Sequence, residues 1–190
     1  YGIILYHPIL EQAKIINIGN ASLSWAFSEC YALKSVEITP DTGSASDLSY
    51  MFTNCYSLTK ISLSTPNAST MEGMFSGCLS LREIDIPNTD SVTNMSSMFS
   101  YNTKFNSPIG NWNVSAVTNM DYMFYNTTNF NQPLSGWNMS SVISVNGMFT
   151  SASAFNQPIG LWNTSNVTNM QEMFNGASAF NQSLSNLNIK

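Results

Sequence analysis

Three cysteines are the side chains of this chain best suited to bind a metal or to form a disulfide, and they are Cys30, Cys55 and Cys78. A structural zinc site needs four ligands with closely spaced pairs, and a disulfide framework normally uses an even number of cysteines. The sequence has neither pattern. We therefore expect three small buried thiols, with no metal and no cofactor. Neighbouring thiols could still form one disulfide in an oxidising compartment.

Side chains that could perform acid–base or nucleophilic chemistry are few. The sole histidine, His7, precedes Pro8 and shares no motif with a serine or cysteine nucleophile. Glu83 and Asp85 could form an acid–base pair, but alternating charges are typical of the outer face of a strand. We therefore expect no catalytic residue and no enzyme activity, and a glycan-active enzyme remains a distant alternative.

Trp112, Trp137 and Trp162 recur every 25 residues, and a row of indoles could form a platform on which sugars stack. Leu187 occupies the next equivalent position, and leucine can fill a core but cannot stack on a sugar as an indole does. We therefore expect the tryptophans to belong to the core. Asparagines also recur in columns, which we expect to satisfy the backbone groups of turns. One such column is Asn106, Asn131, Asn156 and Asn181.

These recurrences belong to a repeat that runs through most of the chain. A phenylalanine, usually preceded by methionine, recurs at intervals of 23 to 25 residues, and another large apolar residue follows it after six residues. About seven such units are present. Units of this length must stack, because one unit alone cannot bury its apolar side chains. The repeat phenylalanines are Phe27, Phe52, Phe75, Phe99, Phe124, Phe149 and Phe174.

The first half of each unit is predicted to be a short helix. In residues 92–99 the valine, the methionines and the phenylalanine are spaced by three and four residues, as on one face of a helix, and residues 117–124 and 167–174 repeat the pattern. A serine upstream of each helix could accept a hydrogen bond from a backbone N–H that has no helical partner. The expected N-cap residues are Ser91, Ser115 and Ser165.

The second half of each unit is predicted to be a short strand. Apolar residues alternate in residues 33–38, 58–63 and 81–86, as in a strand with one buried face. One strand and one short helix make a coil, and stacked coils place the strands side by side in parallel. The predicted fold class is therefore α/β: a solenoid of about seven strand-plus-short-helix coils with one parallel sheet.

Two sets of motifs resemble known families. The pattern Cys-x-x-Leu-x-x-Ile-x-Ile, which begins at Cys78, resembles the leucine-rich repeats of bacterial BspA-like surface proteins. The later units, with Phe-Asn-Gln-Pro at residues 130–133 and 155–158, are similar to the repeats of the mycoplasma lipoprotein-associated family DUF285. The resemblance covers about residues 20–190. It implies a leucine-rich-repeat-like fold in surface or secreted proteins, several of which act in adhesion.

The chain is expected to form one domain. Residues 1–19 fit the repeat poorly and are interpreted as a degenerate first coil or an N-terminal cap. Residues 20–190 are interpreted as a single repeat solenoid, BspA-like to about residue 90 and DUF285-like from about residue 91. The phenylalanine register crosses this change without a Pro/Gly-rich linker, which favours one continuous body.

The composition excludes several classes of function. Only 9% of residues are charged and the net charge is −5, whereas 43% are hydrophobic and 12% are aromatic. The aromatic and apolar content disfavours disorder, and the scattered basic residues disfavour nucleic-acid binding. No apolar run reaches the roughly 18 residues of a membrane-spanning helix, so we expect no membrane insertion. The chain begins at Tyr1, and we interpret it as a processed or trimmed piece.

We therefore expect a non-enzymatic interaction module, extracellular or on a cell surface, that recognises a protein or glycan on another cell or particle. The alternative is a structural subunit of an extracellular filament, sheath or virion that associates end to end. Outward strand positions form the candidate binding face: Ser35, Glu37, Lys60, Ser62, Glu83 and Asp85. Unpaired groups of the last strand form the candidate association edge: Phe180, Leu184, Leu187 and Ile189.

Overall fold

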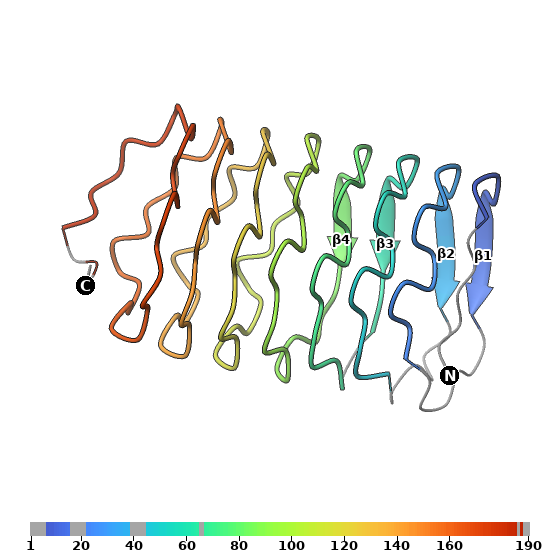
Figure 1. Ribbon diagram of the computed structural model, residues 1–190, viewed down its shortest axis with the longest axis horizontal. Coiled ribbons are helices and arrows are strands. Elements are labelled where there is room, and N and C mark those ends of the chain that lie inside the picture. The colour runs from blue at the N-terminus through green and yellow to red at the C-terminus, as the bar shows by residue number, and fades with distance from the viewer. Residues whose placement is uncertain (1–6, 16–21, 39–44, 65–66, 186, 188–190) are drawn as a thin grey trace.

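The fold was analysed in a computed structural model, which describes residues 7–15, 22–38, 45–64, 67–185 and 187. Successive repeats lie side by side along the longest axis of the molecule, with β1 near one end and the last repeat at the other (Figure 1). Each repeat forms one turn of the stack, so residues about 25 positions apart in the sequence become neighbours in space.

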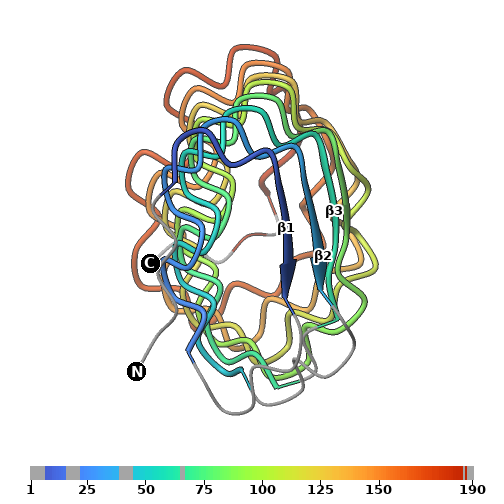
Figure 2. The same cartoon turned by 90° about the vertical axis from the view of Figure 1, so that its right-hand side faces the viewer.

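Four short strands lie in the N-terminal half: β1 (Gln12–Ile15), β2 (Ser35–Ile38), β3 (Lys60–Ser62) and β4 (Glu83–Asp85). β1 pairs with β2 and β3 pairs with β4, both in parallel, so the strands form two separate sheets of two strands. The strand segments expected at residues 33–38, 58–63 and 81–86 are therefore confirmed, although each strand is shorter than its apolar pattern. β1, β2 and β3 lie on one side of the stack (Figure 2).

The predicted fold class is wrong. We expected an α/β, leucine-rich-repeat-like solenoid of about seven strand-plus-short-helix coils with one parallel sheet. The described residues contain no helix, and their strands form two small parallel sheets rather than one continuous sheet. Residues 96–99, 121–124 and 171–174 form turns, and the residues just before them form only an isolated bridge, so Ser91, Ser115 and Ser165 have no helix to cap.

Consecutive turns replace the expected helices because two residues of each repeat have a left-handed backbone. In the first repeat Trp25 has a φ of 62° and Glu29 a φ of 60°. A positive φ at the third residue of a four-residue turn is characteristic of type II turns, whereas an α-helix requires a negative φ throughout. The N–H of Ala26 donates to the carbonyl of Leu23 at 3.1 Å, and the N–H of Cys30 donates to that of Phe27 at 3.2 Å.

The same left-handed positions recur two residues before and two residues after each repeat phenylalanine. Four of these positions are glycine, and the others carry tryptophan, glutamate, tyrosine, asparagine or serine. In chain order they are Trp25, Glu29, Tyr50, Asn54, Gly73, Gly77, Ser97, Tyr101, Tyr122, Asn126, Gly147, Ser151, Glu172 and Gly176.

Backbone N–H groups that do not close a turn donate hydrogen bonds to the next repeat. The N–H groups of Trp25, Phe27 and Glu29 donate to the carbonyls of residues 49, 51 and 53 at 3.0, 2.9 and 2.7 Å. Alternate N–H groups therefore close turns within a repeat, and the others hold neighbouring repeats together. Isolated parallel bridges extend this contact along the stack, from Asp47 to Thr70, Asn94, Asn119, Ser144 and Asn169.

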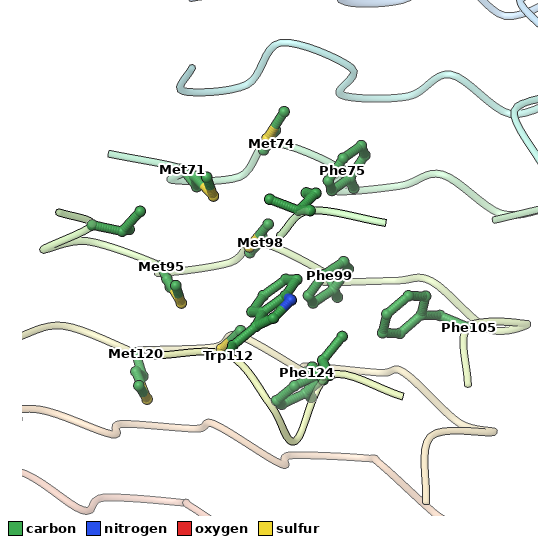
Figure 3. Packing of buried hydrophobic residues seen from close by; sticks show 14 of the residues in the cluster. Met71, Met74, Phe75, Met95, Met98, Phe99, Phe105, Trp112, Met120 and Phe124 are labelled. Atoms are coloured by element: carbon green, nitrogen blue, oxygen red, sulfur yellow. The ribbon is translucent and has the colours of Figure 1, made fainter. Parts of the chain in front are cut away.

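Columns of stacked aromatic rings form the core between the turns and the strand side. Neighbouring repeat phenylalanines stack with centroids 5.4 to 5.8 Å apart. From Phe105 onward a second column joins the first, and Phe99 and Phe105 of one repeat are 4.2 Å apart. Figure 3 shows methionines and Trp112 beside the first column. Burial of these large rings is the main favourable contribution to folding.

Candidate functional site

Outward residues of three strands form the strand face, which consists of Ser35, Glu37, Lys60, Ser62, Glu83 and Asp85. The described residues of these strands alternate between exposed and more buried side chains, and all six predicted residues are exposed. Parallel register places Lys60 beside Glu83 and Ser62 beside Asp85. The structure therefore brings the predicted candidate residues onto one surface.

Charges on the strand face pair with one another. Lys60 Nζ lies 2.9 Å from Glu83 Oε2, and Ser62 Oγ donates to Asp85 Oδ2 at 3.1 Å. On the other sheet, Lys14 Nζ lies 2.8 Å from Glu37 Oε1. The hydrogen bond to Glu83 raises the pKa of Lys60. These exposed ion pairs contribute little stability, because water and salt screen them.

A groove of about 530 Å³ separates the two sheets, because β2 and β3 share no ladder of hydrogen bonds. Glu37 of β2 and Lys60 and Ser62 of β3 line it. The charged side chains Glu37 and Lys60 in its walls are already paired with Lys14 and Glu83. A ligand would have to compete with those intramolecular pairs.

The candidate association edge is only partly exposed. Phe180 and Leu184 are half-buried and Leu187 is buried, whereas Ile189 lies outside the described residues. Phe180 stacks on Phe155 and Phe174, with centroids 6.0 and 4.0 Å away. No contact in the structure tests whether another chain pairs here, so the edge stays a prediction.

The predicted core role of the tryptophans is confirmed. Trp112, Trp137 and Trp162 are at most 7% exposed. The indole N–H of Trp137 donates to the carbonyl of Ile109 at 3.1 Å, and that of Trp162 donates to Leu134 at 3.0 Å. A buried indole whose N–H is satisfied by the neighbouring repeat is unavailable for a sugar.

The cysteines are buried thiols, as expected. The thiol of Cys55 donates to the carbonyl of Phe27 at 3.1 Å, and that of Cys78 donates to Phe52 at 3.0 Å. Burial raises the pKa of both thiols, so they stay protonated and unreactive at neutral pH. The described residues contain no group of three side chains suited to hold a metal ion.

The predicted asparagine column is confirmed. The side-chain oxygens of Asn106, Asn131 and Asn156 each accept from the backbone N–H of the next asparagine in the column at 2.9 Å. These amides connect repeats through the backbone. Their role is structural, so the outside of the turns remains as a candidate binding surface.

A surface that our sequence analysis missed lies on the outside of the turns. We call it the turn face, and it covers the turn segments of residues 22–32, 47–57, 70–80, 94–104, 119–129, 144–154 and 169–179. In Figure 2 these segments run along the side of the stack opposite the strands. Large aromatic side chains are exposed here: Trp25 at 45%, Tyr101 at 49% and Tyr122 at 39%.

One hollow of about 440 Å³ opens on the turn face, and we call it the tyrosine hollow. Phenol rings and hydroxyls from neighbouring repeats dominate its lining, with one carboxylate. The lining residues are Ser76, Ser97, Ser100, Tyr101, Tyr122, Tyr125 and Glu172.

The three tyrosines of the hollow hold one another in place. The ring of Tyr125 meets Tyr101 edge-on at 5.1 Å and Tyr122 edge-on at 5.9 Å. A hydrogen bond with Tyr125 raises the pKa of Tyr101. The hydroxyl of Tyr122 accepts from the amide of Asn146 at 2.8 Å, so both ends of that side chain are fixed.

Glycine at the left-handed position makes room for these rings. A Cβ on Gly147 would lie 2.4 Å from Cε1 of Tyr122, so the ring covers the glycine. Glu172 occupies the same position in the next repeat, and it lines the hollow together with Tyr122 because Gly147 puts no side chain between them. An aromatic residue followed one repeat later by glycine, as in Tyr50 and Gly73, was the sequence signal of this arrangement.

A second aromatic group lies nearer the N-terminus of the turn face. Trp25 stacks on Tyr50 at 4.3 Å, and Tyr31 stacks on Tyr56 at 4.9 Å. The hydroxyl of Tyr50 donates to Glu72 at 2.6 Å. Burial and Glu72 together raise the pKa of Tyr50 to about 12.

Comparison with known families identifies the repeat. A family model described as "Mycoplasma protein of unknown function, DUF285" matches residues 21–86 and 69–187, so the chain belongs to this family. Searches for a similar curated protein and for a similar solved structure gave no match. None of these comparisons confirms the resemblance to BspA-like repeats. Among the described residues, no helix is long and apolar enough to cross a membrane.

Proposed function

We propose that this member of the DUF285 family is a non-enzymatic recognition module, which binds a protein or glycan of another cell or particle. Its place would be a cell surface or the extracellular space. The observation that carries the proposal is the row of exposed aromatic side chains on the turn face. Exposed rings that are held in position are typical of binding surfaces, because they offer large contact area at low cost in entropy.

The fixed geometry of the rings supports this role. Trp25 and Tyr50 stack on each other, and the hydroxyl of Tyr50 is bound to Glu72. Both residues have a left-handed backbone, which restricts their side chains further. Binding would therefore lose little conformational freedom, and more of the contact energy would appear as affinity.

The resemblance of residues up to about 90 to BspA-like surface proteins favours adhesion as the biological setting. The strand face remains a second candidate surface. Lys60 and Glu83 pair with each other and Glu37 pairs with Lys14 of β1, so few of its charged groups are free to bind a ligand.

The proposal is tested by binding of the immobilised protein to purified extracellular-matrix glycoproteins, to the same proteins after deglycosylation, and to neutral oligosaccharides. Two variants compare the surfaces. Tyr50→Gly with Tyr122→Gly removes rings from the turn face, and Glu37→Lys with Glu83→Lys and Asp85→Lys reverses charge on the strand face. We expect saturable binding that the turn-face variant weakens by about tenfold or more, the effect of roughly 1.4 kcal/mol.

The strand-face variant is expected to change affinity by less than about threefold, the size of an effect from screened surface charges. Loss of binding only in the strand-face variant would move the site to the strands. The absence of saturable binding to every member of the panel would contradict the proposed function. Sedimentation of the same samples reports whether copies associate end to end instead.

A further inference from the structure

We propose that the tyrosine hollow binds a neutral carbohydrate, with a pyranose ring against the exposed phenol rings of Tyr101 and Tyr122. This inference rests on the proposed function and assigns one chemical class of ligand to one site. The hollow of about 440 Å³ falls within the size range of small-molecule sites, which is about 300–1,000 Å³.

The lining of the hollow matches the two kinds of surface that a sugar presents. A pyranose has an apolar face of C–H groups, which packs against an aromatic ring, and a rim of hydroxyls, which needs hydrogen-bond partners. Tyr101 and Tyr122 supply exposed rings. Ser76, Ser97 and Glu172 supply polar groups around them.

Several of those polar groups are available to a ligand. Within the described part of the chain, the hydroxyls of Ser76 and Ser97 and the carboxylate of Glu172 make no hydrogen bond. The hydroxyl of Ser100 is occupied, because it donates to the carbonyl of Tyr122 at 2.7 Å. A serine hydroxyl both donates and accepts, and a carboxylate accepts, so the free groups can pair with sugar hydroxyls in either sense.

The charge of the hollow selects a neutral sugar. Glu172 is the one ionisable acid in the lining, and no lysine, arginine or histidine lines the hollow. An anionic sugar or a phosphate would bring a second negative charge beside Glu172 without a cation to offset it.

The arrangement of rings is formed before a ligand arrives. Tyr125 holds Tyr101 and Tyr122 by edge-on contacts, and Asn146 fixes the hydroxyl of Tyr122. Weak contacts with a sugar can therefore give measurable affinity, because the side chains are already ordered.

The repeat itself provides variants that remove a ring and preserve the backbone. Tyr122 has a φ of 56°, and Gly73 and Gly147 occupy the same position in other repeats. Tyr101 has a φ of 64°, and Gly77 and Gly176 are its equivalents. Tyr101→Gly and Tyr122→Gly should therefore fold. Asn54→Gly is the matched control, because it makes the same change to glycine at the left-handed position equivalent to Tyr101, and Asn54 does not line the hollow.

The test is saturation-transfer NMR followed by calorimetric titration, with cellotetraose, mannotetraose, chitotetraose and maltotetraose as neutral probes and tetragalacturonate as the anionic probe. We expect saturable binding of at least one neutral probe and weaker or no binding of tetragalacturonate. Tyr101→Gly and Tyr122→Gly should each lower the affinity by about tenfold or more, and Asn54→Gly by less than about twofold.

Three results would overturn the inference: no neutral probe binds, tetragalacturonate binds more tightly than the neutral probes, or Asn54→Gly weakens binding as much as the hollow variants do. Binding to deglycosylated matrix proteins separates this failure from failure of the proposed function. If those proteins bind and Tyr122→Gly weakens them while the sugars do not bind, the ligand is a protein and the recognition function stands. If neither class binds, both proposals are wrong.

Discussion

Individual residues in this protein are best understood through their equivalents in other repeats. Each repeat contains two left-handed positions, and a left-handed backbone costs an ordinary residue about 1–2 kcal/mol, whereas glycine adopts it freely. Ten of these positions nevertheless carry a side chain. The protein therefore accepts backbone strain at the positions that project from the turn face, which is consistent with side chains retained for binding.

Gly73 shows most clearly what a side chain at a left-handed position would cost in stability. It has a φ of 55°, and a Cβ there would lie 2.3 Å from Cε1 of Tyr50. We expect Gly73→Ala to lower the free energy of unfolding by about 1–3 kcal/mol, because it combines left-handed strain with displacement of a packed ring. Urea denaturation measures the change.

Gly136→Ala is the control, because the nearest atom to its Cβ is a carbonyl oxygen at 3.5 Å and its φ lies outside the left-handed region. It should change stability by less than about 0.5 kcal/mol. Equal effects of the two alanines would contradict the importance of the left-handed turn.

Asn102 is the buried side chain whose polar atoms are left without partners. It is 0% exposed, and within the described residues neither its side-chain oxygen nor its nitrogen has a hydrogen bond. At the same position one repeat later, the hydroxyl of Thr127 donates to the carbonyl of Phe99 at 2.7 Å. An unsatisfied buried polar group costs about 1–3 kcal/mol.

We therefore expect Asn102→Thr to raise the free energy of unfolding by about 1–2 kcal/mol, because the threonine hydroxyl can donate to the preceding repeat. The reciprocal change, Thr127→Asn, should lower it by a similar amount. The midpoints of thermal and urea unfolding report both effects. Destabilisation by Asn102→Thr would show that the amide makes a bond that the fold requires.

The thiols predict how stability depends on pH. Burial raises the pKa of Cys55 and Cys78 in the folded protein, whereas an unfolded thiol ionises near pH 8.5. The folded state keeps its protons when the unfolded state loses them, so stability is full below about pH 8 and falls as the pH rises further. Urea midpoints at pH 7.0 and 9.0 test this, because an unfolded tyrosine with a pKa near 10 is only about one tenth ionised at pH 9.0.

The control is the double variant Cys55→Ala and Cys78→Ala, because Ala152 and Ala177 occupy the same position in later repeats. Its midpoint should fall less between the two pH values. An equal fall in both proteins would assign the pH dependence to other groups.

At the scale of elements, β2, β3 and β4 could be predicted, whereas β1 and the turns could not. Alternating apolar residues in residues 58–63 and 81–86 correctly predicted β3 and β4, because period-two alternation is particular to strands. Spacing by three and four residues is not particular to helices. Consecutive turns also return the chain to the same face every four residues, so Met95, Met98 and Phe99 become buried without a helix.

The left-handed turns could not be recognised from the sequence because few of their left-handed residues are glycine. Tyrosine at positions 101 and 122 does not by itself indicate a positive φ. Only the glycines at the equivalent positions of other repeats, Gly77 and Gly147, indicate it. The strand face could be found from the sequence because it needs only alternation. The tyrosine hollow could not, because it depends on which turn residues from separate repeats project together.

The absence of helix among the described residues predicts a far-UV circular dichroism spectrum without the paired minima of an α-helix. A spectrum of turns and short strands should result, and it should disappear in one cooperative transition on heating. Circular dichroism of the purified chain at neutral pH measures both. Substantial helical signal that melts together with the tertiary structure would mean that the turn segments are helical in solution.

At the scale of the whole molecule, stacking gives each side of the protein a different character. One side carries paired charges on short strands, the interior holds columns of aromatic rings, and the opposite side presents exposed tyrosines. Alternate backbone N–H groups connect every repeat to the next. The turn face is therefore a continuous rigid surface, and its chemistry changes along the stack from stacked ring pairs to the tyrosine hollow.

The central claim is that recognition occurs on the turn face. The most direct test is hydrogen–deuterium exchange of the protein with and without the tightest-binding member of the panel of glycoproteins and oligosaccharides. The account predicts that protection on binding is concentrated in residues 94–104 and 119–129, around Tyr101 and Tyr122. Protection confined to β2, β3 and β4, or to residues 180–187, with the turn segments unchanged, would contradict it.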